Sequence, residues 1–397
     1  MLPYYFLFAF LGICSIFDFN KKHLPEFKLL YALTFFILLL FVGLRHNIGI
    51  DIYEYESYFN SVENNDFSWT LSLDSNEIVS KLEIGYYLIN FLLSKIENFQ
   101  LFIFTITIFN LFALYFYVNK VSIEHKFTFF AILFSFTLFR EFDVVRQSIA
   151  LHIFLISLIY YDKPKKYYFI NLVGASFHIS AIIFLIIYPL IRITFSKASI
   201  YIIFILYLLT FFYQIPFLKV LINLIEPISD AAVFRSLISF FTYLNYPRQF
   251  APTIDIPCLI LLVILITKYN YYSYVSGHKK IMINIFLISI INIIIFSEIT
   301  EVVTRVSYYF YFGIAGMFTI FYGDLKNKFG KLISIFPLIF VLAKLFFMMQ
   351  SEAPRVSYTP YSNYLINTDE YSYSEYLKRK SVSGGYYLNA IDAHQNP

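Results

Sequence analysis

Charge and cysteine are scarce in this chain of 397 residues. Asp, Glu, Lys and Arg make up 14% of the sequence, against about 25% in a soluble domain, and the mean hydropathy is +0.66. The two cysteines, Cys14 and Cys258, both lie in apolar stretches, which argues against a disulfide framework and a cysteine metal site. No basic run is long enough to follow a phosphate backbone, so nucleic-acid binding is not indicated. This composition predicts a polytopic membrane protein.

The motifs of familiar nucleotide enzymes are also missing. The sequence has no P-loop, no glycine-rich dinucleotide turn, no HExxH and no DxD placed for a metal-bound sugar nucleotide. We therefore expect no metal and no cofactor, and a donor substrate that is carried on a lipid. The first apolar run, YYFLFAFLGICSIF, lacks a basic n-region and a small-residue cleavage site, so we expect a retained helix and no removable signal.

Apolar windows predict the helices. A bilayer core of about 30 Å requires roughly 20 apolar residues per helix. The windows predict an all-α membrane protein with about eleven transmembrane helices. They cover residues 4–17, 27–44, 101–118, 127–139, 144–161, 167–191, 200–213, 256–267, 281–296, 306–322 and 332–349.

Basic loops orient these helices, because lysine and arginine accumulate on the cytoplasmic side. The basic loops lie at 21–22, 120–126, 162–166, 277–280 and 324–331. The opposite face then receives the loop 45–83, the breaks at 140–146 and 297–305, and a tyrosine-rich tail over 351–397 whose end, from about residue 381, we expect to be disordered. A membrane domain would cover 1–350, with re-entrant or interfacial helices at 83–99 and within 214–255.

Four arginines converge on this outer face: Arg45, Arg140, Arg146 and Arg305. An arginine at membrane depth costs about 2.5 to 3.5 kcal/mol, so it usually has an anionic partner. Planar guanidinium forks bind phosphate oxygens bidentately, which makes the four arginines candidates for binding a pyrophosphate. A structural alternative stays open, because Asp143 lies three residues from both Arg140 and Arg146, the helical spacing of an ion pair.

Three residues are candidates for a general base. Asp51 follows Gly49, which can adopt the positive φ of a sharp turn, and its carboxylate could act as the base or neutralise Arg45. His178 is an ionisable group in an apolar window that predicts a helix, so it is either a packing residue or a catalyst. Glu83 is the third candidate. Of the three, the sequence favours Asp51 as the base, because Gly49 lets its turn fold back toward Arg45, and His178 comes second because its ordinary pKa suits proton removal at neutral pH.

Five motifs, taken in order, carry a family resemblance: GLRHNIGIDIYEY, VVRQSIA, FHISA, TRVSYYF and YTPYSNYL. Together they resemble the EpsG-like branch of the Wzy O-antigen and capsular polysaccharide polymerases over residues 43–365. Two positions depart from the family pattern. Ile50 stands where a small or hydroxyl residue is commoner, and Arg140 in REF has no counterpart.

The resemblance implies a metal-independent, inverting glycosyltransferase of the GT-C type in the bacterial cytoplasmic (inner) membrane. Such an enzyme joins undecaprenyl-pyrophosphate-linked oligosaccharide repeat units on the periplasmic face and releases undecaprenyl pyrophosphate. The implied partners are these lipid-linked oligosaccharides, membrane lipids, a Wzz-like chain-length regulator and a Wzx-like flippase. The residues implied for the acceptor sugar are Tyr55, Tyr308, Tyr361 and Tyr364. An AT-rich gene is the plainer cause of the total of 36 tyrosines, so their number alone does not indicate carbohydrate binding.

Rival functions share some of these features. An O-antigen ligase would use the same donor, fold type and arginines, but the EpsG-like order of motifs favours a polymerase. A flippase for lipid-linked oligosaccharides would distribute charge through its spans and show repeat symmetry, whereas here the charges cluster at one face. A membrane O-acyltransferase would require a catalytic histidine near a cytoplasmic donor.

Overall fold

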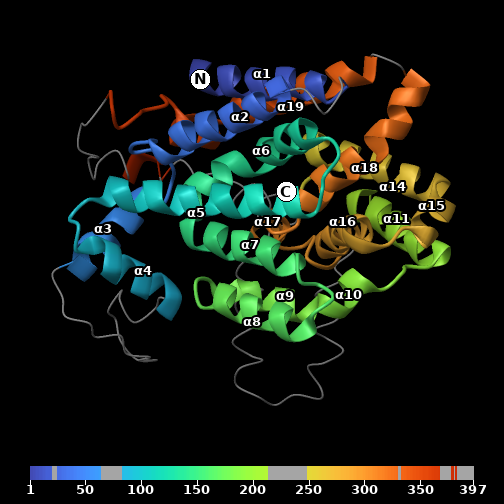
Figure 1. Cartoon of the computed structure of the whole chain (residues 1–397), viewed down its shortest axis with the longest axis horizontal. Helices are drawn as coiled ribbons and strands as arrows, with labels where there is room; N and C mark the ends of the chain where they lie inside the picture. The colour runs from blue at the N-terminus through green and yellow to red at the C-terminus, as the bar shows by residue number, and fades with distance from the viewer. Residues whose placement is uncertain are drawn as a thin grey trace, which may run out of the picture. The chain divides into compact units, whose positions relative to one another are not determined.

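The computed structural model describes residues 1–19, 25–63, 83–212, 248–329, 332–366, 377–379 and 381. Within these ranges every regular element is a helix, and the one strand-like feature is an isolated bridge between Arg45 and Asn363 (Figure 1). The predicted all-α architecture is therefore confirmed. The chain divides into two compact units, Met1–Ile187 with Asp324–Pro397, and Tyr188–Gly323.

The first unit is a layered helical bundle. Within it α1 packs against α6 and α19, α2 packs against α5, and α7 packs between α5 and α8 (Figure 1). Its α-helices are α1 (Leu2–Ile16), α2 (Pro25–Gly43), α3 (Ile52–Glu63), α4 (Ile84–Ser94), α5 (Phe99–Lys120), α6 (Lys126–Asp143), α7 (Val145–Leu158), α8 (Pro164–Ala175), α9 (Ile183–Ile186), α19 (Leu332–Gln350) and α20 (Glu352–Tyr358), with short 3-10 helices η1 (Phe17–Phe19) and η3 (Ile179–Ile182).

Local sequence signals explain where several of these helices begin and how closely they pack. The side chain of Asn98 accepts a hydrogen bond from the Leu101 N–H (2.9 Å) and caps the N-terminus of α5. Pro164 starts α8, where its missing N–H has no cost. Gly12 lets α1 approach α19, because a Cβ at this position would lie 2.6 Å from Leu338 Cδ1.

The second unit contains α10 (Tyr188–Arg192), α11 (Lys197–Phe212), α14 (Pro252–Thr267), α15 (Tyr269–Tyr274), α16 (Gly277–Ile295), α17 (Thr300–Tyr308) and most of α18 (Tyr311–Phe329). Here α16 is central and packs against α10, α11 and α17. In this unit the buried carboxylate of Asp255, on α14, accepts hydrogen bonds from the Tyr207 hydroxyl (2.7 Å) and Arg248 Nη2 (2.6 Å). These bonds stabilise the packing of α11 against α14.

Two of the described helices, Phe99–Lys120 and Gly277–Ile295, are long and apolar enough to cross a membrane. A third span results if the bent pair Ser334–Gln350 and Glu352–Tyr358, which meet at 100°, counts as one. Shorter apolar helices of 10–17 residues cover most of the other predicted windows. The interfacial helices predicted within 214–255 fall mainly outside the described residues.

Two predicted helices are not continuous. The window 306–322 is divided between α17, which ends at Tyr308, and α18, which begins at Tyr311. The window 167–191 was expected to form a single span, but α8 ends at Ala175 and the chain continues as the short helices η3, α9 and α10. The break has a physical cause, because backbone groups at this point bond to the start of α4. The Ser176 carbonyl accepts the Gly85 N–H (2.7 Å), and the Ile179 N–H donates to Glu83 Oε1 (2.9 Å).

Candidate functional site

Three of the predicted site residues meet in the first unit. Glu83 Oε2 accepts a hydrogen bond from Arg146 Nη1 at 2.8 Å, and Glu83 Oε1 lies 3.1 Å from His178 Nδ1. Arg146 belongs to the first turn of α7, Glu83 precedes α4, and His178 lies in the break after α8. We call these three residues the Glu83 cluster.

The backbone around the break places these side chains. Glu83 is extended (φ −65°, ψ 141°) directly before α4, and His178 is extended (φ −157°, ψ 118°) directly before η3. Gly85 permits the close approach of the two segments, because a Cβ there would lie 2.8 Å from the Ser176 carbonyl oxygen. His178 therefore sits at a chain break and is not part of a continuous apolar helix, contrary to the sequence prediction.

The cluster determines the chemistry of its acid and its histidine. Burial raises the pKa of the Glu83 carboxyl, but hydrogen bonds from His178 and the Ile179 N–H and the charge of Arg146 outweigh it and lower the pKa to about 2. Glu83 is therefore ionised at neutral pH and a weak base. A carboxylate beside Nδ1 favours the tautomer in which Nδ1 carries the proton and Nε2 is the basic atom. His178 consequently has a nitrogen that can accept a proton.

Tyr55 and Asp51 lie beside this cluster. Asp51 precedes α3, and its carbonyl accepts the Tyr55 N–H (3.1 Å). Burial raises the pKa of the Tyr55 hydroxyl, and the nearby Arg146 charge opposes this shift while Asp51 adds to it. The Arg146 guanidinium also lies over the Tyr86 ring, 5.8 Å from its centroid, a cation–π contact. Arg146 thus links α3, through Tyr55, and α4, through Tyr86, to the other members of the Glu83 cluster.

Arg45 has different surroundings, although it was predicted for the same role. Its exposed fraction is 4%, and its Nη1 and Nη2 atoms donate to the carbonyls of Val42 (2.6 Å) and Glu141 (3.3 Å). Burial lowers the pKa of Arg45 to about 10, and the negative charge of Glu141 partly opposes the shift. Its guanidinium lies 5.0 Å from the centre of the Phe142 ring. Arg45 is thus held by the protein itself.

The C-terminal tail pairs with the loop that contains Arg45. The Tyr364 N–H donates to the Leu44 carbonyl (2.8 Å), and the His46 N–H donates to the Ser362 carbonyl (3.1 Å). Tyr361 stacks on Phe41 at a centroid distance of 4.3 Å, and its hydroxyl donates to the Phe41 carbonyl (2.8 Å). Two of the sequence motifs, GLRHNIG and YTPYSNYL, therefore form one structural unit.

The turn after Arg45 has the geometry that the sequence predicted. Gly49 has φ +118°, and a Cβ there would lie 3.0 Å from Asp143 Oδ1. The next residue, Ile50, donates its N–H to the same carboxylate oxygen at 2.8 Å. Asp143 also accepts a hydrogen bond from the Tyr358 hydroxyl. The carboxylate of Asp143 thus ties the loop and the tail to the end of α6, while Arg146 pairs with Glu83.

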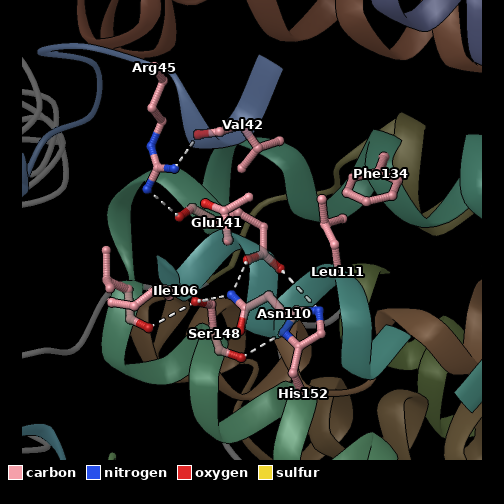
Figure 2. A pocket seen from close by; sticks show the side chains of 11 residues that line it. Val42, Arg45, Ile106, Asn110, Leu111, Phe134, Glu141, Ser148 and His152 are labelled. Atoms are coloured by element: carbon pink, nitrogen blue, oxygen red, sulfur yellow. Dashed lines mark hydrogen bonds and ion pairs between the residues drawn. The ribbon is translucent and has the colours of Figure 1, made fainter. Parts of the chain in front are cut away.

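A small cavity of about 20 Å³ lies under Arg45 (Figure 2). Its polar lining includes Asn110, Glu141, Ser148 and His152, and all four side chains are buried. Asn110, Glu141 and His152 were not predicted as site residues from the sequence. The available signal was a polar residue at an inward position of an otherwise apolar helix.

The remaining predicted residues are not all brought to this place. Arg140 lies in the last turn of α6 and is partly buried, and Tyr364 contacts the His46 ring at 5.4 Å. Arg305 and Tyr308 belong to α17 in the second unit, where Arg305 is exposed and Tyr308 is buried.

Apolar helices that end in buried charged clusters define a helical protein of the membrane type. The chain belongs to the EpsG family, whose model matches residues 28–363. This match includes the Arg45 loop, the Glu83 cluster and the tail as far as Asn363, the bridge partner of Arg45. No curated protein and no solved structure matches the chain.

Proposed function

We propose that this protein is a Wzy-type polysaccharide polymerase of the inner membrane, with its site on the periplasmic face. It would join undecaprenyl-pyrophosphate-linked repeat units as a metal-independent, inverting glycosyltransferase of the GT-C type and release undecaprenyl pyrophosphate. Membership of the EpsG family supports polymerisation as the class of activity. The single observation that carries the mechanism is the contact of Arg146 and His178 with one carboxylate, Glu83.

Arg146 is the residue that we assign to the pyrophosphate. Its side chain is 27% exposed, and Glu83 fixes its orientation through Nη1. Glycosyl transfer breaks the bond between the anomeric carbon and the pyrophosphate oxygen, so negative charge grows on that oxygen. A preoriented guanidinium stabilises this charge in the transition state. Arg305 and Arg140 are proposed to add positive charge for the same leaving group.

His178 is the base that we favour. The acceptor hydroxyl oxygen attacks the anomeric carbon from the face opposite the pyrophosphate, and its proton passes to His178 Nε2 while the pyrophosphate leaves. Glu83 holds the imidazole and stabilises the imidazolium that forms, because its pKa of about 2 keeps it ionised. Asp51 is the second candidate, since its charge acts on Tyr55 beside Arg146.

We assign the acceptor sugar to Tyr55, Tyr308, Tyr361 and Tyr364. Tyr55 lies closest to the proposed chemistry through its interaction with Arg146. Tyr361 and Tyr364 border the Arg45 loop, and Tyr308 belongs to the second unit. A flippase would deliver the lipid-linked units and a chain-length regulator would end polymer growth, so both are proposed partners.

The test uses full-length protein in nanodiscs with lipid-linked repeat units. We expect polymer to form without any added lipid A core acceptor, and we expect His178→Ala to abolish it while the protein still binds the donor. Asp51→Asn identifies the base: a dead Asp51→Asn beside an active His178→Ala would transfer this role to Asp51. Product that forms only with a lipid A core acceptor would make the protein a ligase, and transport without glycosidic bond formation would make it a flippase.

A further inference from the structure

The corner between α6 and α7 carries a second set of buried polar residues, which the proposed chemistry does not use. Helix α6 ends at Asp143, Val144 has non-helical dihedrals (φ −112°, ψ 60°), and α7 begins at Val145. Arg146 is the second residue of α7. The direction of this arginine therefore depends on how the corner is fixed.

One amide bridges the two sides of the corner. Asn110 Nδ2 on α5 donates to Glu141 Oε2 (3.2 Å) before the corner and to Ser148 Oγ (3.0 Å) after it. The Ser148 carbonyl lies 2.8 Å from His152 Nδ1, and His152 Nε2 lies 4.0 Å from Glu141 Oε1. Figure 2 shows Asn110 between Glu141 and Ser148, with Arg45 directed toward Glu141 from above. These contacts close a ring of polar groups around the cavity.

The size and charge of the cavity decide what this ring can do. Its volume of about 20 Å³ exceeds the roughly 10–15 Å³ that a single water requires, so it is far too small for a sugar. The Glu141 side chain is 9% exposed and its carboxylate would repel a pyrophosphate. The ring therefore acts on the backbone of the corner and makes no contact with substrate.

Stability alone does not explain why these polar side chains are buried around the cavity. Burying a carboxylate costs free energy, and apolar residues of similar volume often pack as well or better. Asn110 Oδ1 and Arg45 Nε are also buried without a hydrogen-bond partner among the residues that the structure describes. A polar ring kept at this cost specifies one geometry of the corner.

We propose that Asn110 and Glu141 are positioning residues, whose hydrogen bond holds the α6–α7 corner so that Arg146 keeps its place against Glu83. This inference rests on the proposed function, because it assigns the pair to the reaction that Arg146 serves. Arg45 supports the same corner through its bond to the Glu141 carbonyl.

A swap of the two groups tests the pair. Asn110→Asp removes the donor and places two carboxylates together, whereas Glu141→Gln keeps an acceptor oxygen and only replaces the charge-assisted bond by a weaker amide–amide bond. The double variant restores one amide and one carboxylate in reversed positions. Glu124→Gln is the control, because Glu124 is exposed near the other end of α6. All variants are full-length proteins in nanodiscs.

Asn110→Asp should lower kcat about 10-fold or more, since small misplacements of catalytic groups have effects of this size, and Glu141→Gln should lower it less. KM for the lipid-linked donor should change less than kcat, and the swap should recover most of the activity that Asn110→Asp loses. Hydrogen–deuterium exchange over residues 141–150 should rise in Asn110→Asp and return toward the wild-type level in the swap. An Asn110→Asp variant with wild-type kcat and wild-type exchange would overturn the proposal, and so would a swap as impaired as Asn110→Asp.

The two readouts separate this inference from the proposed function. If wild-type protein forms no polymer, or if Arg146→Gln polymerises normally, the proposed function fails. The exchange measurement still reports whether Asn110 and Glu141 hold the corner. If Arg146→Gln is inactive while both single variants resemble the Glu124→Gln control, only the positioning role fails.

Discussion

Arg146 and Arg45 look alike in the sequence and differ in the structure. Both lie at the end of an apolar segment on the same predicted face, but the Arg146 side chain is 27% exposed and pairs with a carboxylate. Arg45 is 4% exposed and donates to two backbone carbonyls. The difference teaches that position at a helix end does not tell a partly exposed arginine that pairs with a carboxylate from one that is buried against backbone carbonyls.

The largest expected effect comes from Arg146→Lys. Lysine keeps the positive charge but loses the planar fork, so it cannot hold Glu83 and a phosphate oxygen together in the same way. We expect polymer formation to fall by about 100-fold or more, the loss typical of one removed charge-stabilising donor. The measurement is chain growth with purified lipid-linked units at matched protein amounts. An Arg146→Lys enzyme of normal rate would place Arg146 among the structural arginines.

Arg45→Lys should act mainly on stability. The substitution removes at least one of the two bonds to the carbonyls of Val42 and Glu141. Hydrogen bonds of charged groups contribute about 1.5–3 kcal/mol, so the free energy of unfolding should fall by about 2 kcal/mol. Thermal unfolding in nanodiscs measures the change. If the variant unfolds like wild type but loses donor binding, Arg45 contacts the substrate and the contrast with Arg146 disappears.

Glu83 should make stability depend on pH in the acid range. Its pKa falls from 4.5 to about 2 in the folded protein, so its contribution is fully present above pH 4.5 and is lost as the pH falls toward 2. The thermal unfolding temperature of the wild-type protein should therefore fall as the pH is lowered from 4.5 toward 2. The Glu83→Gln variant should show a flatter dependence there. Equal slopes for the two proteins would mean that Glu83 has no such depressed pKa.

How much of the structure the sequence predicts depends on how far apart along the chain the contacting residues lie. The positive φ of Gly49 follows from a local turn signal and is confirmed. The break at His178 was missed, because its cause is a carboxylate 95 residues away. The ion pair that the sequence suggested for Arg146 was with its near neighbour Asp143. In the structure Arg146 pairs with Glu83, which is 63 residues away in the chain. Local patterns predict turns and helix starts, but they cannot show which distant segment completes a site.

The same limit applies to Glu141 and Asn110. Each is a polar residue in an apolar helix, which marks it as unusual, yet nothing in the sequence relates one to the other. Their partnership follows from the packing of α5 against α7 at the corner after α6. The membrane face assigned to the loop 45–83 and the tail is still a prediction. The backbone pairing of Leu44 and His46 with the tail makes it natural that both segments share one face.

The smallest expected effect is at Tyr361, in the tail segment that pairs with the Arg45 loop. This residue was predicted to bind the acceptor sugar, but its hydroxyl donates to the Phe41 carbonyl and its ring stacks on Phe41. Tyr361→Phe removes the hydrogen bond and keeps the stack, so stability should fall by about 1 kcal/mol. If Tyr361 only fastens the tail to α2, KM for the acceptor repeat unit should stay at the wild-type value. A clear rise in that KM, with unchanged stability, would show that the hydroxyl binds sugar.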